Sequence, residues 1–314
     1  NRTFVRFSQF AMKAFYVFAM ALSLAVAGCM PSAYSQATST TEEAFSPIVL
    51  PALPDELDFA GERVPLEYFD VREALQRELL VTGYLHSRTF LTLLAMDRYF
   101  SIIEPILRRN GIPEDFKYLC MAESGLNPEA VSPSGAGGLW QFMPATGREY
   151  GLKVGNQVDE RFHIEKSTEA ACRYLKKAYE KLGSWTLAAA AYNAGENGVV
   201  RRTGIQGTDS YYDTFLPQET MRYVYRILSL KLIASDPAAY GYRYRPEDRY
   251  PRLDDCREVA VGGRDISWSE VARRYGTNYK MLRLLNPWIR AYEYDNPGNE
   301  TLQVKMPGQH FRTR

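Results

Sequence analysis

The chain has 314 residues, 46% of them hydrophobic, so it is long enough to bury a substantial core in one large or two modest domains. Its formal net charge is +1, and this near-neutral balance gives no reason to expect nucleic acid as a partner. The three histidines, His86, His163 and His310, lie far apart without the spacing of metal ligands. No feature of the sequence predicts a metal or an organic cofactor.

Residues 1–28 have the features of a lipoprotein signal peptide. Three basic residues precede an uncharged apolar stretch over residues 14–27, which is too short to span a bilayer comfortably. The stretch ends in the tetrapeptide VAGC at residues 26–29, which resembles the bacterial lipobox. The resemblance implies that Cys29 carries a lipid anchor to the membrane. Met30, in place of Asp, favours the outer membrane of a bacterial cell envelope, with the protein facing the periplasm. The alternative is a plain signal peptide that is cut later, for example after Ser35.

Residues 29–65 are predicted to be a flexible tether, because up to about Pro54 they are rich in Ser, Thr, Ala and Pro and have no amphipathic period. Residues 66–240 then show one helical pattern after another, with few strand signals. Helices are predicted over residues 84–109, 166–182, 185–194 and 218–234, with Ser167 and Ser184 as N-caps.

Glu123 occupies an unusual position in a further predicted helix, which begins at Pro113 and stops at Gly125. Phe116, Leu119 and Cys120 form an apolar stripe at helical spacing, and Glu123 falls on the same face of the helix. Its carboxyl group is therefore drawn toward the core. A carboxyl group held against apolar packing has a raised pKa, as a general acid near neutral pH requires. The alternatives are a buried Glu satisfied by a salt bridge and a side chain that rotates to solvent.

Residues 256–308 are predicted to form a small second domain. Residues 258–261 and 302–306 are expected to be strands, and residues 268–275 and 279–285 helices. The order of elements is β-α-α-β. The fold class is therefore mainly α, with a helical domain followed by this small unit.

Three short blocks in a fixed order carry the functional information. They are Glu123-Ser124-Gly125, the stretch GLWQFMP over residues 138–144, and AYNAG over residues 191–195. The ordered triple resembles the lysozyme-like catalytic domain of the soluble-lytic-transglycosylase type, from the family twenty-three glycoside hydrolases. The resemblance is close over about residues 105–205 and looser over the rest of the helical domain.

The resemblance implies a role for each matching residue. Glu123 would be the single catalytic acid and base, and Ser124 would orient the substrate or Glu123. Gly138 and Gln141 would bind substrate in the cleft, and Tyr192 and Asn193 would border the scissile bond. The Tyr192 hydroxyl would lie near Glu123 or the acetamido group of the substrate.

The reaction implied is cleavage of the β-1,4 bond between N-acetylmuramic acid and N-acetylglucosamine in peptidoglycan glycan strands. The 6-hydroxyl of the substrate would attack, leaving a 1,6-anhydro sugar. No motif places a second Asp or Glu as a partner. Asp159 and Glu160 lie in a turn that could face the cleft, but a solvated loop with charges at a helix start is the favoured interpretation. The alternatives are a hydrolytic goose-type muramidase, which would need such a carboxylate, and a non-catalytic wall-binding lipoprotein that uses the cleft as a lectin.

The C-terminal unit resembles a LysM peptidoglycan-binding module. The similar features are the two predicted helices, the Asn286-Pro287 pair that follows them, and a last strand ending in Pro307. It departs from the pattern at residues 263–267, where GRDIS stands in place of the usual Gly-Asp-Thr-Leu turn. A structural cap on the catalytic domain is therefore an alternative to a glycan-binding module.

Overall fold

The computed structural model describes residues 49–312, which belong to one compact unit of the chain. The predicted signal peptide, Cys29 and the predicted tether up to residue 48 lie outside the described residues. Among residues 49–312, no helix has both the length and the apolar character needed to cross a membrane.

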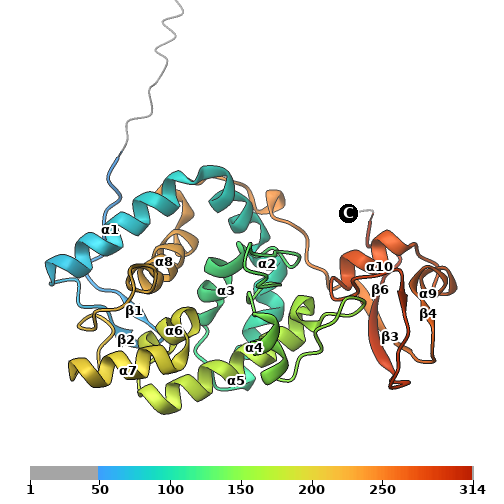
Figure 1. Ribbon diagram of the computed structural model, residues 1–314. Coiled ribbons are helices and arrows are strands. Elements are labelled where there is room, and N and C mark those ends of the chain that lie inside the picture. The colour runs from blue at the N-terminus through green and yellow to red at the C-terminus, as the bar shows by residue number, and fades with distance from the viewer. Residues whose placement is uncertain (1–48, 313–314) are drawn as a thin grey trace, which may run out of the picture. The chain divides into compact units, whose positions relative to one another are not determined.

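Helices dominate the chain as far as residue 248 (Figure 1). A short antiparallel pair, β1 (Asp58–Phe59) and β2 (Glu62–Arg63), precedes them. The helices are α1 (Phe69–Tyr84), α2 (His86–Arg109), α3 (Phe116–Ser124), α4 (Pro144–Glu149), α5 (Ile164–Leu182), α6 (Trp185–Ala194), α7 (Glu196–Gln206) and α8 (Gln218–Ser235), with 3-10 turns at Glu160–Phe162, Pro237–Tyr240 and Pro246–Asp248. The predicted mainly helical fold class is confirmed.

Helix α3 lies at the centre of the helical part and packs against both α2 and α8 (Figure 1). Helix α6 packs against α5, α7 and α8, and its four alanines at residues 188–191 are fully buried. Because alanine has a small side chain, it lets neighbouring helices approach closely. The short helix α3 is thus fixed from both sides by longer ones.

Some predicted helix boundaries are confirmed and others are wrong. Ser184 caps α6, and its hydroxyl accepts a hydrogen bond from the backbone of Leu187. Ser167, however, lies inside α5, which begins one turn earlier at Ile164. Helix α3 begins at Phe116 rather than Pro113. The Asp115 side chain before it accepts hydrogen bonds from the backbone of Ala60 and from Lys231, both at 2.8 Å, so it serves tertiary contacts.

The C-terminal module, defined here as residues 256–307, has the predicted β-α-α-β order. Strand β3 (Cys256–Val261) pairs antiparallel with β6 (Leu302–Pro307), and Val259 lies opposite Val304. Helices α9 (Trp268–Arg274) and α10 (Tyr279–Leu285) lie between them in sequence, together with the short pair β4 (Ile266–Ser267) and β5 (Glu293–Tyr294). The buried side chains of the module form one hydrophobic cluster, and two residues outside the module, Val158 and Phe162, belong to it.

Candidate active site

Glu123 lies in the last turn of α3, as predicted from the apolar stripe. Phe116, Leu119 and Cys120 on that stripe are fully buried, and Glu123 itself is half-buried. Gly125 ends the helix with a φ of +61°, a left-handed conformation that glycine adopts without strain. The stripe therefore draws the carboxyl group inward at the point where the helix gives way to a loop.

Burial raises the pKa of Glu123 from its ordinary value of 4.5 to about 7. Two groups on α8 act in the opposite direction: Tyr223, whose hydroxyl donates a hydrogen bond to Oε1, and the positive charge of Arg226. Because the resulting pKa is near neutrality, the group can release and take up a proton in one catalytic cycle. Among the described residues, the only other carboxylate that shifts this pKa is the exposed Glu219.

Tyr192 lies within electrostatic reach of Glu123, but its hydroxyl is engaged elsewhere. It donates a hydrogen bond of 2.7 Å to the backbone oxygen of Trp140. The hydrogen bond to Glu123 comes from Tyr223 instead, and the expected place of the Tyr192 hydroxyl beside the acetamido group of a substrate stays a prediction. Burial and the charge of Glu123 raise the pKa of Tyr192 well above its ordinary value. It therefore stays a neutral phenol that ties α6 to the second sequence block.

Ser124 and Asn193 also make hydrogen bonds within the protein. The Ser124 hydroxyl donates to the backbone oxygen of Cys120 at 3.3 Å, within its own helix. The Asn193 side-chain oxygen accepts from the Thr220 hydroxyl at 2.9 Å and so joins α6 to α8. Thr220 lies one turn before Tyr223, so this bond helps to set the register of the two helices beside Glu123.

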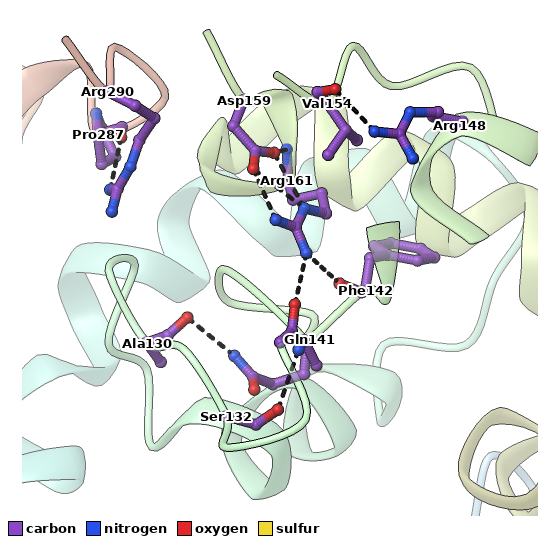
Figure 2. Close-up of polar contacts among 12 residues, drawn as sticks. Ala130, Ser132, Gln141, Phe142, Arg148, Val154, Asp159, Arg161, Pro287 and Arg290 are labelled. Carbon is purple, nitrogen blue, oxygen red and sulfur yellow. Dashed lines mark hydrogen bonds and ion pairs between the residues drawn. The ribbon is translucent and has the colours of Figure 1, made fainter. Parts of the chain in front are cut away.

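Gly138 and Gln141 shape the loop that carries the second block. Gly138 has a φ of +79°, and a Cβ there would lie 1.9 Å from the backbone oxygen of Arg161. Gln141 has a φ of +49°, which is uncommon for a residue with a side chain. Its side-chain nitrogen donates to the backbone oxygen of Gly138 at 2.7 Å and to that of Ala130 at 3.2 Å. Figure 2 shows the bond to Ala130. Of the predicted site residues, Gln141 thus contacts Gly138 directly, whereas the side chains of Ser124, Tyr192 and Asn193 bond to residues outside the set.

The expectation that Asp159 and Glu160 lie in a solvated loop is wrong. Asp159 is 5% exposed and Glu160 is 4% exposed. Asp159 pairs with Arg161, while Glu160 accepts hydrogen bonds from the backbone of Lys153 at 2.8 Å and from the Lys166 side chain at 2.5 Å. Both buried carboxylates therefore have hydrogen-bond partners within the protein.

A cavity of ≈ 270 Å³ borders the C-terminal end of α3. Its lining residues include Met121, Ala122 and Gly125 of the α3 end, together with three arginines, Arg88, Arg222 and Arg226. Glu123 is not among them, although Arg226 is shared because its charge acts on that carboxyl group. The cavity is therefore a neighbour of the catalytic candidate rather than its own pocket.

Comparisons with known proteins find two matching domains and similar relatives. Residues 100–215 match the transglycosylase SLT domain, and residues 257–310 match the soluble lytic transglycosylase C-terminal LysM-like domain. The chain is 31% identical over 248 residues to "Membrane-bound lytic murein transglycosylase D" of Escherichia coli K12, which covers 76% of this chain and 52% of that protein. The same figures hold for the protein of E. coli O6:H1. The chain thus spans about half the length of these curated relatives.

A solved structure of an inactive mutant of the lytic transglycosylase Slt from Pseudomonas aeruginosa is also similar. It is 24% identical and covers 48% of this chain and 26% of that one, with a TM-score of 0.37. On the domain matches, residues 100–215 of this chain belong to the transglycosylase SLT domain family, and residues 257–310 to the LysM-like domain found at the C-terminus of soluble lytic transglycosylases.

Proposed function

We propose that this chain is a peptidoglycan lytic transglycosylase in which Glu123 is the single acid and base. The observation that supports this most directly is the carboxyl group of Glu123, with a pKa raised to about 7 by burial. Within residues 49–312, the exposed Glu219 is the only other carboxylate that acts on this pKa. Ordinary glycosidases use two carboxylates, one of which acts as a nucleophile or activates water. A single carboxylate suffices when the substrate supplies the attacking group.

In the proposed reaction, Glu123 gives its proton to the oxygen of the β-1,4 bond between N-acetylmuramic acid and N-acetylglucosamine. The bond from that oxygen to the muramic C1 breaks, and the N-acetyl group stabilises the cationic carbon. The 6-hydroxyl of the same sugar then attacks C1, and its proton passes to Glu123. The products are a 1,6-anhydro end and a free N-acetylglucosamine 4-hydroxyl, and Glu123 returns to its protonated form.

We propose Ser124, Gly138, Gln141, Tyr192 and Asn193 as the substrate-binding set. Tyr192 and Asn193 join α6 to the second block and to α8, and Gln141 holds the loop of that block in its left-handed turn. A rigid frame of this kind keeps a sugar aligned with the acid. The proposed domains are residues 66–240 for catalysis and residues 256–308 for the LysM-like module.

The proposed location is the bacterial outer membrane, facing the periplasm, with Cys29 as the lipid attachment site. The supporting observations are the apolar stretch and the VAGC tetrapeptide at residues 26–29. Incorporation of labelled palmitate that is lost in Cys29→Ser tests this proposal. Unchanged soluble export of the wild-type protein without label would count against it.

Mass spectrometry of peptidoglycan digested with the purified protein tests the reaction. Anhydro-muropeptides are expected among the soluble products. Fragments with reducing-end sugars would indicate a hydrolytic muramidase instead, and binding without soluble fragments would indicate a lectin. Glu123→Gln in the same assay separates cleavage by this site from cleavage by a contaminating enzyme.

A further inference from the structure

Asp159 and Arg161 form a buried ion pair at the base of the loop that carries the second block. The Arg161 side chain contacts Asp159 through Nε, at 3.0 and 3.2 Å from the two carboxylate oxygens, and through Nη2 at 2.7 Å. The side chain of Arg161 is only 10% exposed and that of Asp159 only 6%. The carboxylate therefore fixes the plane of the guanidinium group.

The remaining nitrogen of that guanidinium group is directed at the loop. Nη1 donates to the backbone oxygen of Gly135 at 2.7 Å and to that of Phe142 at 3.0 Å. These two oxygens lie at opposite ends of the stretch that contains Gly138 and Gln141. Figure 2 shows Arg161 reaching from Asp159 toward this loop. One guanidinium group thus clamps both ends of the loop.

The backbone of Arg161 also packs directly against the loop. Gly138 lies so near that a Cβ would meet the Arg161 oxygen at 1.9 Å, and a Cβ on Gly137 would meet the Phe162 ring at 2.8 Å. The loop thus lies directly on the segment that supplies the clamp. A side chain at either position would collide with residues 161–162.

The C-terminal module holds the other side of the same segment. The backbone nitrogen of Asp159 donates to the oxygen of Trp288 at 2.9 Å, and that of Arg290 donates to the oxygen of Gln157 at 2.8 Å. Val158, between these two bonds, is buried in the hydrophobic cluster of the module. Residues 157–159 therefore run as an added strand-like edge between the module and the loop.

We propose that Arg161 is a positioning residue that fixes the Gly135–Phe142 loop for substrate, with Asp159 and the docked C-terminal module as its support. This rests on the proposed function, because the loop carries the proposed substrate-binding residues Gly138 and Gln141. The module then contributes to catalysis by holding the segment that positions the loop, in addition to any glycan binding of its own.

Arginine suits this role better than lysine. A guanidinium group presents five N–H donors in a rigid plane, so it can hold a carboxylate and two carbonyl oxygens at once. An ammonium group is a single point that keeps the charge but loses this fork. A buried ion pair is by itself weak evidence of stabilisation, because desolvation offsets much of the attraction. A specific positioning role gives a reason for the pair.

Arg161→Lys, with Arg148→Lys as its control, tests the proposal. Arg148 is exposed and donates at 3.0 Å to the Val154 oxygen, away from the loop (Figure 2). In Arg161→Lys we expect amide exchange to rise in a peptide spanning residues 135–142 and to stay unchanged in α5. On soluble, uncrosslinked peptidoglycan strands we expect KM to rise about tenfold or more, with kcat changed by less than about twofold. Arg148→Lys should leave all three quantities at wild-type values.

The pH profile separates positioning from an effect on the acid. Arg161 is not among the groups that shift the pKa of Glu123, so the basic limb of kcat/KM should stay in place. Unchanged exchange and unchanged KM in Arg161→Lys would overturn the proposal, as would a shifted basic limb. If Arg161→Lys fails to fold, Asp159→Asn, which keeps the shape of the side chain, is held to the same outcomes.

The exchange measurement also distinguishes this inference from the proposed function. If the wild-type protein released no anhydro-muropeptides, the proposed function would fail, while increased exchange confined to residues 135–142 would still support the clamp. If the protein were active but the loop exchanged as in the wild type, the clamp would be refuted and the proposed function would stand.

Discussion

The hydroxyl of Tyr223 donates a hydrogen bond to Oε1 of Glu123, joining α8 to the end of α3. A donor to a carboxylate favours the ionised form, whereas burial of the carboxyl group disfavours it. The pKa of about 7 for Glu123 is the balance between these opposing effects, with burial the larger. Tyr223 therefore limits how far burial raises this pKa, and so affects the pH range in which the acid carries its proton.

Tyr223→Phe is predicted to move the basic limb of kcat/KM to higher pH. The wild-type rate should fall above about pH 7, because the general acid must be protonated in the free enzyme. Removing the hydroxyl removes a bond that favours the ionised form, so the pKa of Glu123 rises. A hydrogen bond to a charged group contributes about 1.5–3 kcal/mol, which corresponds to a shift of about one pH unit or more.

Tyr192→Phe is the matched control for this change. It also removes one buried phenol hydroxyl from the same neighbourhood, but that hydroxyl donates to the Trp140 oxygen. Its basic limb should therefore stay within a few tenths of a unit of wild type. A limb that moves equally in both variants, or downward in Tyr223→Phe, would show that Tyr223 does not control the acid.

Glu123→Gln is predicted to lower the yield of anhydro-muropeptides at least by the roughly 10²–10⁴-fold typical of a general acid–base group. The amide is nearly the same size as the carboxylic acid and can still accept the bond from Tyr223, so the fold should persist. Circular dichroism and the thermal midpoint provide the check on folding. Retention of most of the activity in a folded variant would remove Glu123 from the mechanism.

The same variant is predicted to be more stable than wild type at alkaline pH. The pKa of Glu123 is 4.5 when unfolded and about 7 when folded, so between these values only the unfolded state ionises. Wild-type stability is therefore lost as pH rises from about 4.5 to 7, by on the order of 3 kcal/mol in total. Glu123→Gln does not titrate and escapes this loss.

Urea unfolding of both proteins at pH 5 and pH 8 measures the effect. The free energy of unfolding of Glu123→Gln, relative to wild type, should rise by about 2.5 kcal/mol between these two pH values. Titrations of other groups are common to both proteins and cancel in the difference. A difference that is independent of pH would mean that the carboxyl group is not desolvated.

Local signals allowed much of the fold to be predicted. The apolar stripe and Gly125 predicted the place of Glu123, Ser184 predicted the start of α6, and the module elements follow their apolar periods closely. Such features act within one or two turns of the chain and are readable without tertiary contacts. Boundaries failed where a polar side chain serves a distant partner, as Asp115 does with Lys231.

The partners of the site residues were less accessible, because they are far away in sequence. Tyr223 is 100 residues from Glu123 and is one of two tyrosines on an amphipathic helix. The available signal was its place on the buried face with Thr220, Val224 and Ile227. Asp159 is expected from the sequence to lie in a solvated loop, since no local pattern indicates that the C-terminal module covers it or that Arg161 pairs with it. Only the fold brings these groups together.

Gly138→Ala is predicted to destabilise the protein far more than Gly135→Ala. Both glycines have left-handed backbones, with φ of +79° and +87°, so each substitution carries a similar strain of about 1–2 kcal/mol. Only at residue 138 would the new Cβ strike the Arg161 backbone, whereas at residue 135 nothing lies within 4 Å. Thermal midpoints of the two variants isolate the contact. Equal midpoints would mean that the loop can lift off the Arg161 segment.

Phe162→Ala tests whether the module and the catalytic part share one core. Phe162 is 4% exposed and lies in the hydrophobic cluster of the module, although it belongs to the 3-10 turn before α5. Its truncation should cost about 3–5 kcal/mol and raise amide exchange in α9, α10 and the β3–β6 pair as well as around residue 162. Leu187→Ala, at a 1% exposed position in the core of the helical part, is the control. In Leu187→Ala, amide exchange should rise around α6, while exchange in the module should change only as far as the lower global stability requires.

The two variants are compared at matched global stability. A cavity in a shared core loosens the elements on both of its sides. If amide exchange in the module were the same in both variants, Phe162 would stabilise the helical part alone.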